Sequence, residues 1–354
     1  MSLSRFRAEG FRCLSEISIE PHPRLNLITG ANASGKTSLL EAIYYLGRGR
    51  SFRASSSREL IRTGAQGFTL FGLAGTGERT HRAGVEVEPG ERRGRVDGQP
   101  ATSADLAKVL PVQAIDPEVH SLVQGAPEFR RRFLDWGVFH VKHDYLLNWR
   151  RYQTALRQRN AALRRAQPPA SVRAFDAELV TAGERVAQQR REYFTDFMQL
   201  FSPICSEILP FDVICGYSQG WAEGSSFAEA LAQSWPGDCA RGTTQTGPHR
   251  ADLRLQVQAR RARYRVSRGQ QKLLAATLMV TQVRHAAPHV PAELLLLVDD
   301  PAAELDRDNR NRLFALLHDV PAQLFITALD RADLPADQPA LRLHLDDGTP
   351  TTLL

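Results

Sequence analysis

Residues 24–40 read RLNLITGANASGKTSLL, and this stretch decides the fold of the chain. Leu25, Leu27 and Ile28 predict a short buried strand, and the residues after Thr37 predict a helix. Between them, residues 30–37 match the spacing G-x4-G-K-[ST]. A strand, a glycine-rich loop and a helix in this order are the context in which the pattern surrounds phosphate groups.

The loop is therefore expected to bind ATP. Its backbone N–H groups would surround the β- and γ-phosphates, and the residues concerned are Gly30, Ala31, Asn32, Ala33, Ser34, Gly35, Lys36 and Thr37. Lys36 adds a positive charge, and the Thr37 hydroxyl is a candidate ligand of Mg²⁺. Ala33 stands where many such loops have glycine; if the position needs a positive φ, alanine costs roughly 1–2 kcal/mol.

A second part of the site is predicted near the C-terminal end. The apolar run Leu294–Val298 predicts a buried strand, and it is followed by Asp299 and Asp300. Asp299 is a candidate Mg²⁺ ligand together with Thr37. Asp300 is a candidate catalytic residue, together with Lys36, because a carboxylate here can orient the attacking water. The same pair could instead cap a following helix.

Three residues at the start of another predicted helix complete the pattern. Ser267, Gly269 and Gln270 resemble the signature of ABC ATPases, which contacts the γ-phosphate held by a second protomer. Ser267 could equally be a plain N-cap. Residues 302–306 resemble the D-loop of the same proteins, and Gln113 is a candidate for the glutamine that senses the metal. In this arrangement two chains meet head to tail around two ATP molecules, so ATP favours the dimer.

Composition limits the cellular setting. The net charge is +6 and 42% of the residues are hydrophobic, which permits a folded core and a polyanionic partner. The apolar runs are far shorter than the ~20 residues of a membrane span, and the N-terminus has no signal-peptide pattern. The four cysteines form no metal-ligand cluster. These features predict a cytoplasmic protein without a membrane partner.

Several further stretches are specific to one family. Residues 41–47, 49–53, 131–140, 247–253 and 267–272 resemble the RecF family, and the resemblance extends from Phe6 to about Thr327. It implies an α/β fold: an ABC/SMC-type P-loop ATPase head built from both chain ends, with an inserted α-helical lobe. It also implies an ATP-dependent homodimer on duplex DNA near single-strand gaps. Such proteins cooperate with RecO and RecR to load the RecA recombinase during gap repair, replication restart and the SOS response.

The resemblance also implies a DNA-dependent ATPase whose hydrolysis releases the dimer. Two departures from related ATPases bear on its rate and class. Asp300 is one methylene shorter than the glutamate that transporters and SMC proteins carry, which favours slow hydrolysis. Thr327 stands where transporters place a switch histidine.

Charge and periodicity predict the organisation of the chain. Residues 1–115 and 245–354 are expected to form the ATPase domain, and 116–244 a mainly helical lobe that faces DNA or a partner. On one predicted helix of this lobe, Arg150, Arg157 and Arg164 recur every seven residues, with Arg151, Arg159 and Arg165 nearby. No acidic residue occurs from Tyr145 to Val172. The three arginines are candidate DNA-phosphate contacts, although a solvated face would have the same pattern.

Two other functions fit parts of the sequence. The nucleotide-binding subunit of a membrane transporter would need the switch histidine and a surface for membrane helices. An SMC-type DNA tether would need hundreds of heptad residues between the two halves of the site, and the sequence has none.

Overall fold

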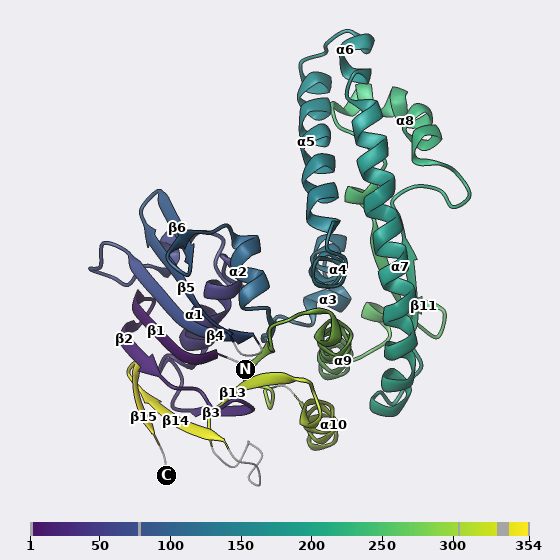
Figure 1. The fold of residues 1–354 in the computed structure, drawn as a ribbon. Helices are drawn as coiled ribbons and strands as arrows, with labels where there is room; N and C mark the ends of the chain where they lie inside the picture. Colours follow the sequence, from purple (N-terminus) through teal and green to yellow (C-terminus); the bar gives the residue numbers. More distant parts are fainter. Residues whose placement is uncertain (1–2, 77–78, 304, 331–339, 353–354) are drawn as a thin grey trace. The chain divides into compact units, whose positions relative to one another are not determined.

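The computed structural model describes residues 3–76, 79–303, 305–330 and 340–352 (Figure 1). The chain divides into two compact units. The first combines Met1–Val119 with Arg268–Leu354, and the second is the continuous segment His120–Ser267. Among the helices in the described ranges, none is both long enough and apolar enough to cross a membrane.

The first unit contains a six-stranded sheet of mainly parallel strands. Its order is β15 (Thr349–Thr352), β14 (Leu341–Asp346), β3 (Leu25–Thr29), β13 (Ala322–Ala328), β12 (Leu294–Val298) and β8 (Val112–Ile115). Only β15 is antiparallel to its neighbour. Every residue of β3, β8, β12 and β13 is buried, and β12 is a continuous apolar run. The carboxyl ends of β3, β13 and β12 therefore meet at one edge of the sheet.

A second, antiparallel sheet completes the core of this unit. Its order is β2 (Leu14–Ile19), β1 (Leu3–Phe11), β4 (Phe68–Thr76), β5 (Arg79–Glu88), β6 (Glu91–Val96) and β7 (Gln99–Pro100). The buried Gln323 amide of β13 joins the two sheets, because it accepts from Leu3 N and donates to Leu3 O, both at 3.0 Å.

Helices cover these sheets. Helix α1 (Lys36–Arg48) packs against strands of both sheets, and its buried face includes Leu39, Leu40 and Ile43. The other helical segments in the described part of this unit are η1 (Ser57–Leu60), α2 (Ser103–Val109), α9 (Arg268–Ala286), η4 (Ala287–His289) and α10 (Arg307–His318).

The second unit is mainly helical. Its helices are α3 (Ser121–Gln124), α4 (Pro127–Val141), α5 (Tyr145–Arg164), α6 (Pro169–Arg173), α7 (Asp176–Ile208), α8 (Phe227–Arg241), η2 (Pro248–Arg250) and η3 (Ala262–Tyr264). Helices α5 and α7 lie side by side (Figure 1). A small sheet of β11 (Arg260–Arg261), β10 (Asp252–Val257) and β9 (Ile214–Ser218) packs beside α4.

This small sheet changes the domain boundary expected from the sequence. The lobe extends to Ser267 instead of ending at residue 244. Strand β10 was expected to return to the ATPase domain, but it pairs with β9, and Asp252 forms an ion pair with Arg130 of α4. These contacts assign residues 245–267 to the second unit.

Candidate nucleotide-binding site

The loop between β3 and α1 has the backbone that its glycines predict. Gly30 has φ 150°, and a Cβ there would lie 2.3 Å from the Leu345 carbonyl oxygen. Gly35 has φ 104° immediately before α1. Ala33 has φ 65°, so the position does adopt the left-handed conformation, at a cost of roughly 1–2 kcal/mol for alanine. Strain of this kind is concentrated at functional sites.

Polar groups of the loop converge on the start of α1. The Lys36 ammonium donates to the carbonyl oxygens of Gly30 at 2.6 Å and Ala31 at 2.7 Å. Burial lowers the pKa of Lys36, while the nearby Asp300 and Asp299 carboxylates oppose that shift. The buried Ser34 hydroxyl has no hydrogen-bond partner among the described residues. A cation, an unsatisfied hydroxyl and a helix N-terminus fit the phosphates of a nucleotide.

Asp299 connects this loop to β12 and β13. The Thr37 hydroxyl donates to Asp299 Oδ2 at 2.8 Å, and the Thr327 hydroxyl donates to Asp299 Oδ1 at 2.7 Å. The structure thus brings the two predicted metal ligands, Thr37 and Asp299, into direct contact. A hydroxyl and a buried carboxylate are hard oxygen donors, so these side chains fit Mg²⁺.

Asp300 lies beside them on a constrained backbone with φ 45°. Its amide donates to the Thr327 hydroxyl at 2.9 Å. The buried Lys272 ammonium of α9 donates to the carbonyl oxygens of Asp300 at 3.2 Å and Ala303 at 2.8 Å. Lys272 therefore ties the helix that follows Ser267 to the candidate catalytic loop.

Asp116 is a carboxylate that the sequence reasoning missed. It follows β8, and the Asp299 amide donates to Ile115 O at 2.9 Å, which sets the two carboxylates side by side. Burial, with a contribution from Asp299, raises the pKa of Asp116 to about 6. Its Oδ1 is buried without a hydrogen-bond partner among the described residues. Its position directly after a buried strand, like that of Asp299, was the available signal.

The structure does not bring Gln113 to this site. Its side chain is buried within β8 and donates to Gln282 Oε1 of α9 at 2.7 Å. The amide that was expected to sense the metal instead packs the helix on the sheet.

The signature residues lie at the start of α9. Ser267 is exposed directly before the helix, and Gly269 and Gln270 are half-buried in its first turn. In the D-loop stretch, the Asp306 carboxylate accepts from the Asn309 amide at 2.8 Å and caps α10. Glu304 of that stretch lies outside the described residues.

The arginines of α5 divide into two groups. Arg150, Arg157 and Arg164 are exposed and form no ion pair with a described residue. Arg159, which lies near them in the sequence, does not belong to this surface. Arg159 is fully buried and bonds Asp176 and Asp238, both at 2.7 Å. Arg151 is exposed but pairs with Glu178.

Comparison with known proteins agrees with this arrangement. Residues 2–348 match the family described as the RecF/RecN/SMC N-terminal domain. The DNA replication and repair protein RecF of Azotobacter vinelandii is 41% identical over 357 aligned residues, covering 98% of both chains. That of Pseudomonas syringae pv. tomato is 40% identical, covering 98% of this chain and 97% of the relative.

Solved structures give the same result for the fold. The recombination mediator protein RecF with ATP, of the RecFOR pathway, has a TM-score of 0.89 and 25% identity, covering 100% of this chain and 98% of that one. An Smc head bound to the C-terminal winged-helix domain of ScpA has a TM-score of 0.60 at 17% identity, covering 100% and 97%. The expected ABC/SMC-type head fold is confirmed, and the chain belongs to the RecF family of DNA replication and repair proteins.

Proposed function

We propose that the chain is a slow, DNA-dependent ATPase that dimerises on ATP and acts in the recombinational repair of single-strand gaps. In this role it cooperates with RecO and RecR to load RecA, which links it to replication restart and the SOS response, in the cytoplasm. The contact of Thr37 with Asp299 carries the ATPase part of the proposal, because it joins the two halves of the site. Similarity to RecF proteins over 98% of the chain supports the repair role.

Different residues of the first unit are proposed to bind the phosphates, hold Mg²⁺ and orient the attacking water. Lys36 and the amides of residues 30–37 bind and orient the phosphates. Thr37 and Asp299, with Asp116 beside them, would hold Mg²⁺, which neutralises phosphate charge when bound. Asp300 orients the attacking water. Its position depends on Thr327 and Lys272, which hold its amide and carbonyl groups.

Dimerisation follows from the exposed signature. Ser267, Gly269 and Gln270 of one protomer are proposed to contact the γ-phosphate bound by the partner's loop. A ligand that is fully bound only in the dimer stabilises the dimer, and its hydrolysis removes that stabilisation. ATP thus acts as a reversible clamp.

The exposed arginines of α5 are proposed to contact duplex DNA. Arg150, Arg157 and Arg164 lie on one helix at a spacing of seven residues and have no acidic partner among the described residues. Such contacts bind phosphates without reading the sequence of bases.

Size-exclusion chromatography tests the whole proposal. The protein is run under three conditions: alone, with ATP and Mg²⁺, and with ATP, Mg²⁺ and a gapped duplex. The expected result is a monomer alone, a dimer with ATP, and a dimer that co-elutes with the gapped duplex. A monomer under all three conditions would overturn the clamp, and ATP-dependent dimers that never bind DNA would overturn the DNA role.

A further inference from the structure

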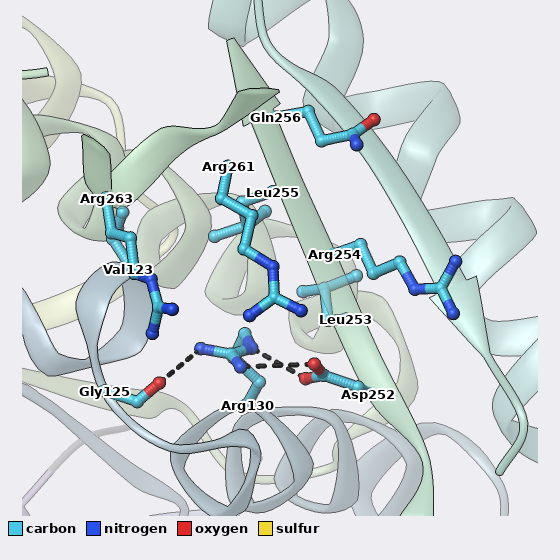
Figure 2. Close-up of a pocket in the computed structure, with 10 residues that line it drawn as sticks. All are labelled: Val123, Gly125, Arg130, Asp252, Leu253, Arg254, Leu255, Gln256, Arg261 and Arg263. Atoms are coloured by element: carbon cyan, nitrogen blue, oxygen red, sulfur yellow. Dashed lines mark hydrogen bonds and ion pairs between the residues drawn. The ribbon is translucent and has the colours of Figure 1, made fainter. Parts of the chain in front are cut away.

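The second unit contains a small cavity of about 50 Å³ that is rich in arginine (Figure 2). Arg130, Arg261 and Arg263 line it together with one carboxylate, that of Asp252. We call these four residues the arginine pocket. About 10–15 Å³ of such volume holds one water molecule, so the cavity has room for a group of the size of a phosphate.

Arg130 neutralises the only carboxylate of the arginine pocket. Its Nε donates to Asp252 Oδ1 at 2.7 Å, and its Nη2 donates to Oδ2 at 3.2 Å. Its Nη1 donates to the Gly125 carbonyl oxygen at 2.9 Å. The pair is therefore rigid and carries no net charge.

Arg261 then adds a positive charge that has no counter-charge among the described residues. Figure 2 shows its guanidinium pointing into the pocket, toward the Arg130–Asp252 pair. Its side chain forms no hydrogen bond or ion pair with any residue of the described ranges. The sequence has no Asp or Glu from Leu253 to Ala292, so the surrounding segment offers no counter-charge. Converging guanidinium groups around a small cavity are suited to an oxyanion with several acceptor oxygens.

An exposed aromatic ring adjoins the arginine pocket. Tyr264 is 69% exposed. The guanidinium carbon of Arg263 lies 4.5 Å from the centre of its ring, and Arg263 also donates to its hydroxyl. An aromatic ring beside a positive groove is the combination that binds single-stranded nucleic acids, because the bases stack and the phosphates pair with cations.

We propose that the arginine pocket binds a backbone phosphate of single-stranded DNA, with Tyr264 stacked on an unpaired base next to it. The inference rests on the proposed DNA-binding function and deepens it, since it assigns the single strand of a gapped duplex to a site separate from the arginines of α5. The carboxylate of an acidic peptide matches the charge of the pocket but leaves the exposed ring without a role.

Fluorescence anisotropy with labelled oligothymidylate and with a blunt duplex tests this site. Arg261→Ala is expected to weaken binding to oligothymidylate roughly 5-fold or more, and to reduce the slope of log K against log salt by about 0.7. Tyr264→Leu is expected to weaken the same binding roughly 5-fold to 100-fold, and Tyr264→Phe to restore most of it. Arg260→Ala is the matched control, because Arg260 is an exposed neighbour with the same charge that does not line the cavity. Thermal melts verify that each variant is folded, and Arg261→Lys retains the charge if the alanine variant unfolds.

Three outcomes would overturn the assignment. In the first, Arg261→Ala and Arg260→Ala bind oligothymidylate equally well. In the second, Arg261→Ala loses affinity for blunt duplex as much as for the single strand. In the third, polyglutamate or free inorganic phosphate competes as strongly as an oligonucleotide. Wild-type protein separates this inference from the proposed function: if it binds no DNA at all, the function fails, whereas equal binding by wild type and variants removes only the arginine pocket.

Discussion

Two threonine hydroxyls, those of Thr37 and Thr327, donate to opposite oxygens of the Asp299 carboxylate. The Thr327 hydroxyl oxygen also accepts from the Asp300 amide. The orientation of both aspartates is thus fixed before any nucleotide arrives. Preorganised polar groups of this kind lower the cost of reaching the transition state.

Asp300→Asn tests whether Asp300 orients the attacking water while Asp299 serves as the Mg²⁺ ligand. The neutral amide lacks the charged oxygens that orient the attacking water, so hydrolysis is expected to fall by roughly 10²- to 10⁴-fold, while ATP binding and dimerisation persist. Phosphate release measures the first effect, and chromatography with ATP measures the second. Hydrolysis at the wild-type rate would show that another group orients the water.

His249 makes the stability of the second unit depend on pH. Burial lowers the pKa of His249 to about 4 from an ordinary value of 6.5. Its ring nitrogens lie 2.5 Å from the Tyr152 hydroxyl and 3.0 Å from Thr244 O. As pH falls through 6.5 the unfolded chain binds the proton first, so stability is complete above 6.5 and declines toward pH 4, by up to about 3 kcal/mol.

Urea unfolding of wild type and of His249→Gln between pH 7.5 and 5 measures this effect. The wild type is expected to lose more stability than the variant over that range. Parallel pH profiles would mean that the pKa of His249 is the same in the folded and unfolded chain.

The sequence predicted those side chains whose position depends on local spacing. Gly30, Lys36 and Thr37 belong to one contiguous loop, so their positions follow from the pattern. Asp116 was missed and Gln113 was wrongly placed at the site, because the register between β8 and β12 decides which residue lies next to Asp299. The pairing of strands that are far apart in the sequence cannot be predicted from a local sequence pattern.

The Lys272 side chain connects helix α9 to the loop after β12 by hydrogen bonds to two carbonyl oxygens. Lys272→Met is expected to leave the carbonyl oxygens of Asp300 and Ala303 without this donor, at a cost of about 1–3 kcal/mol. Hydrolysis should fall more than ATP affinity, because the phosphate-binding loop is unchanged. Lys108→Met, which removes an exposed lysine of α2, is the control. An equal fall in affinity and turnover would argue for general destabilisation.

Helix α5 carries the proposed duplex contacts. Replacing Arg150, Arg157 and Arg164 together by Ala should weaken binding to all duplex sequences alike. It should also flatten the salt slope by up to about 0.9 for each DNA phosphate that is no longer neutralised. Replacing Arg185, Arg191 and Arg241, which are exposed elsewhere in the unit, changes the charge equally and should have a smaller effect. An unchanged slope in the α5 variant would show that these arginines are solvated and do not contact DNA phosphates.

Strands and helices were predicted well where their pattern was strong. The buried strands β3 and β12 and the mainly helical character of the second unit are present as expected. The sheet that β10 joins was not predictable, because a strand with alternating polar and apolar residues can pair in either unit. The Arg130–Asp252 pair and β9 decide it.

In the proposed dimer, Ser267 of each chain completes the ATP site of its partner. Ser267→Arg should bind ATP normally but neither dimerise nor hydrolyse, because a bulky cation fills the space for the partner's γ-phosphate. Mixed with Lys36→Met, it should recover part of the turnover, since one of the two composite sites is then intact. Turnover is measured across mixing ratios.

A plain N-cap role for Ser267 predicts something different. The substitution would then cost about 1 kcal/mol of stability. Dimerisation and hydrolysis would survive below the melting temperature. Wild-type activity in folded Ser267→Arg would contradict the proposal that two chains share each ATP site.

The position of β3 between β13 and β14 has a consequence for biosynthesis. The phosphate-binding strand pairs Leu25 with Leu324 on one side and Asn26 with Leu341 on the other. A ribosome makes these partners some 300 residues after β3, at roughly 5–20 residues per second. The uninterrupted segment His120–Ser267 emerges whole in the meantime and can fold first. Nascent chains should therefore acquire the compact helical lobe before they can bind ATP, and termination between residues 267 and 320 should yield a folded lobe with no nucleotide site.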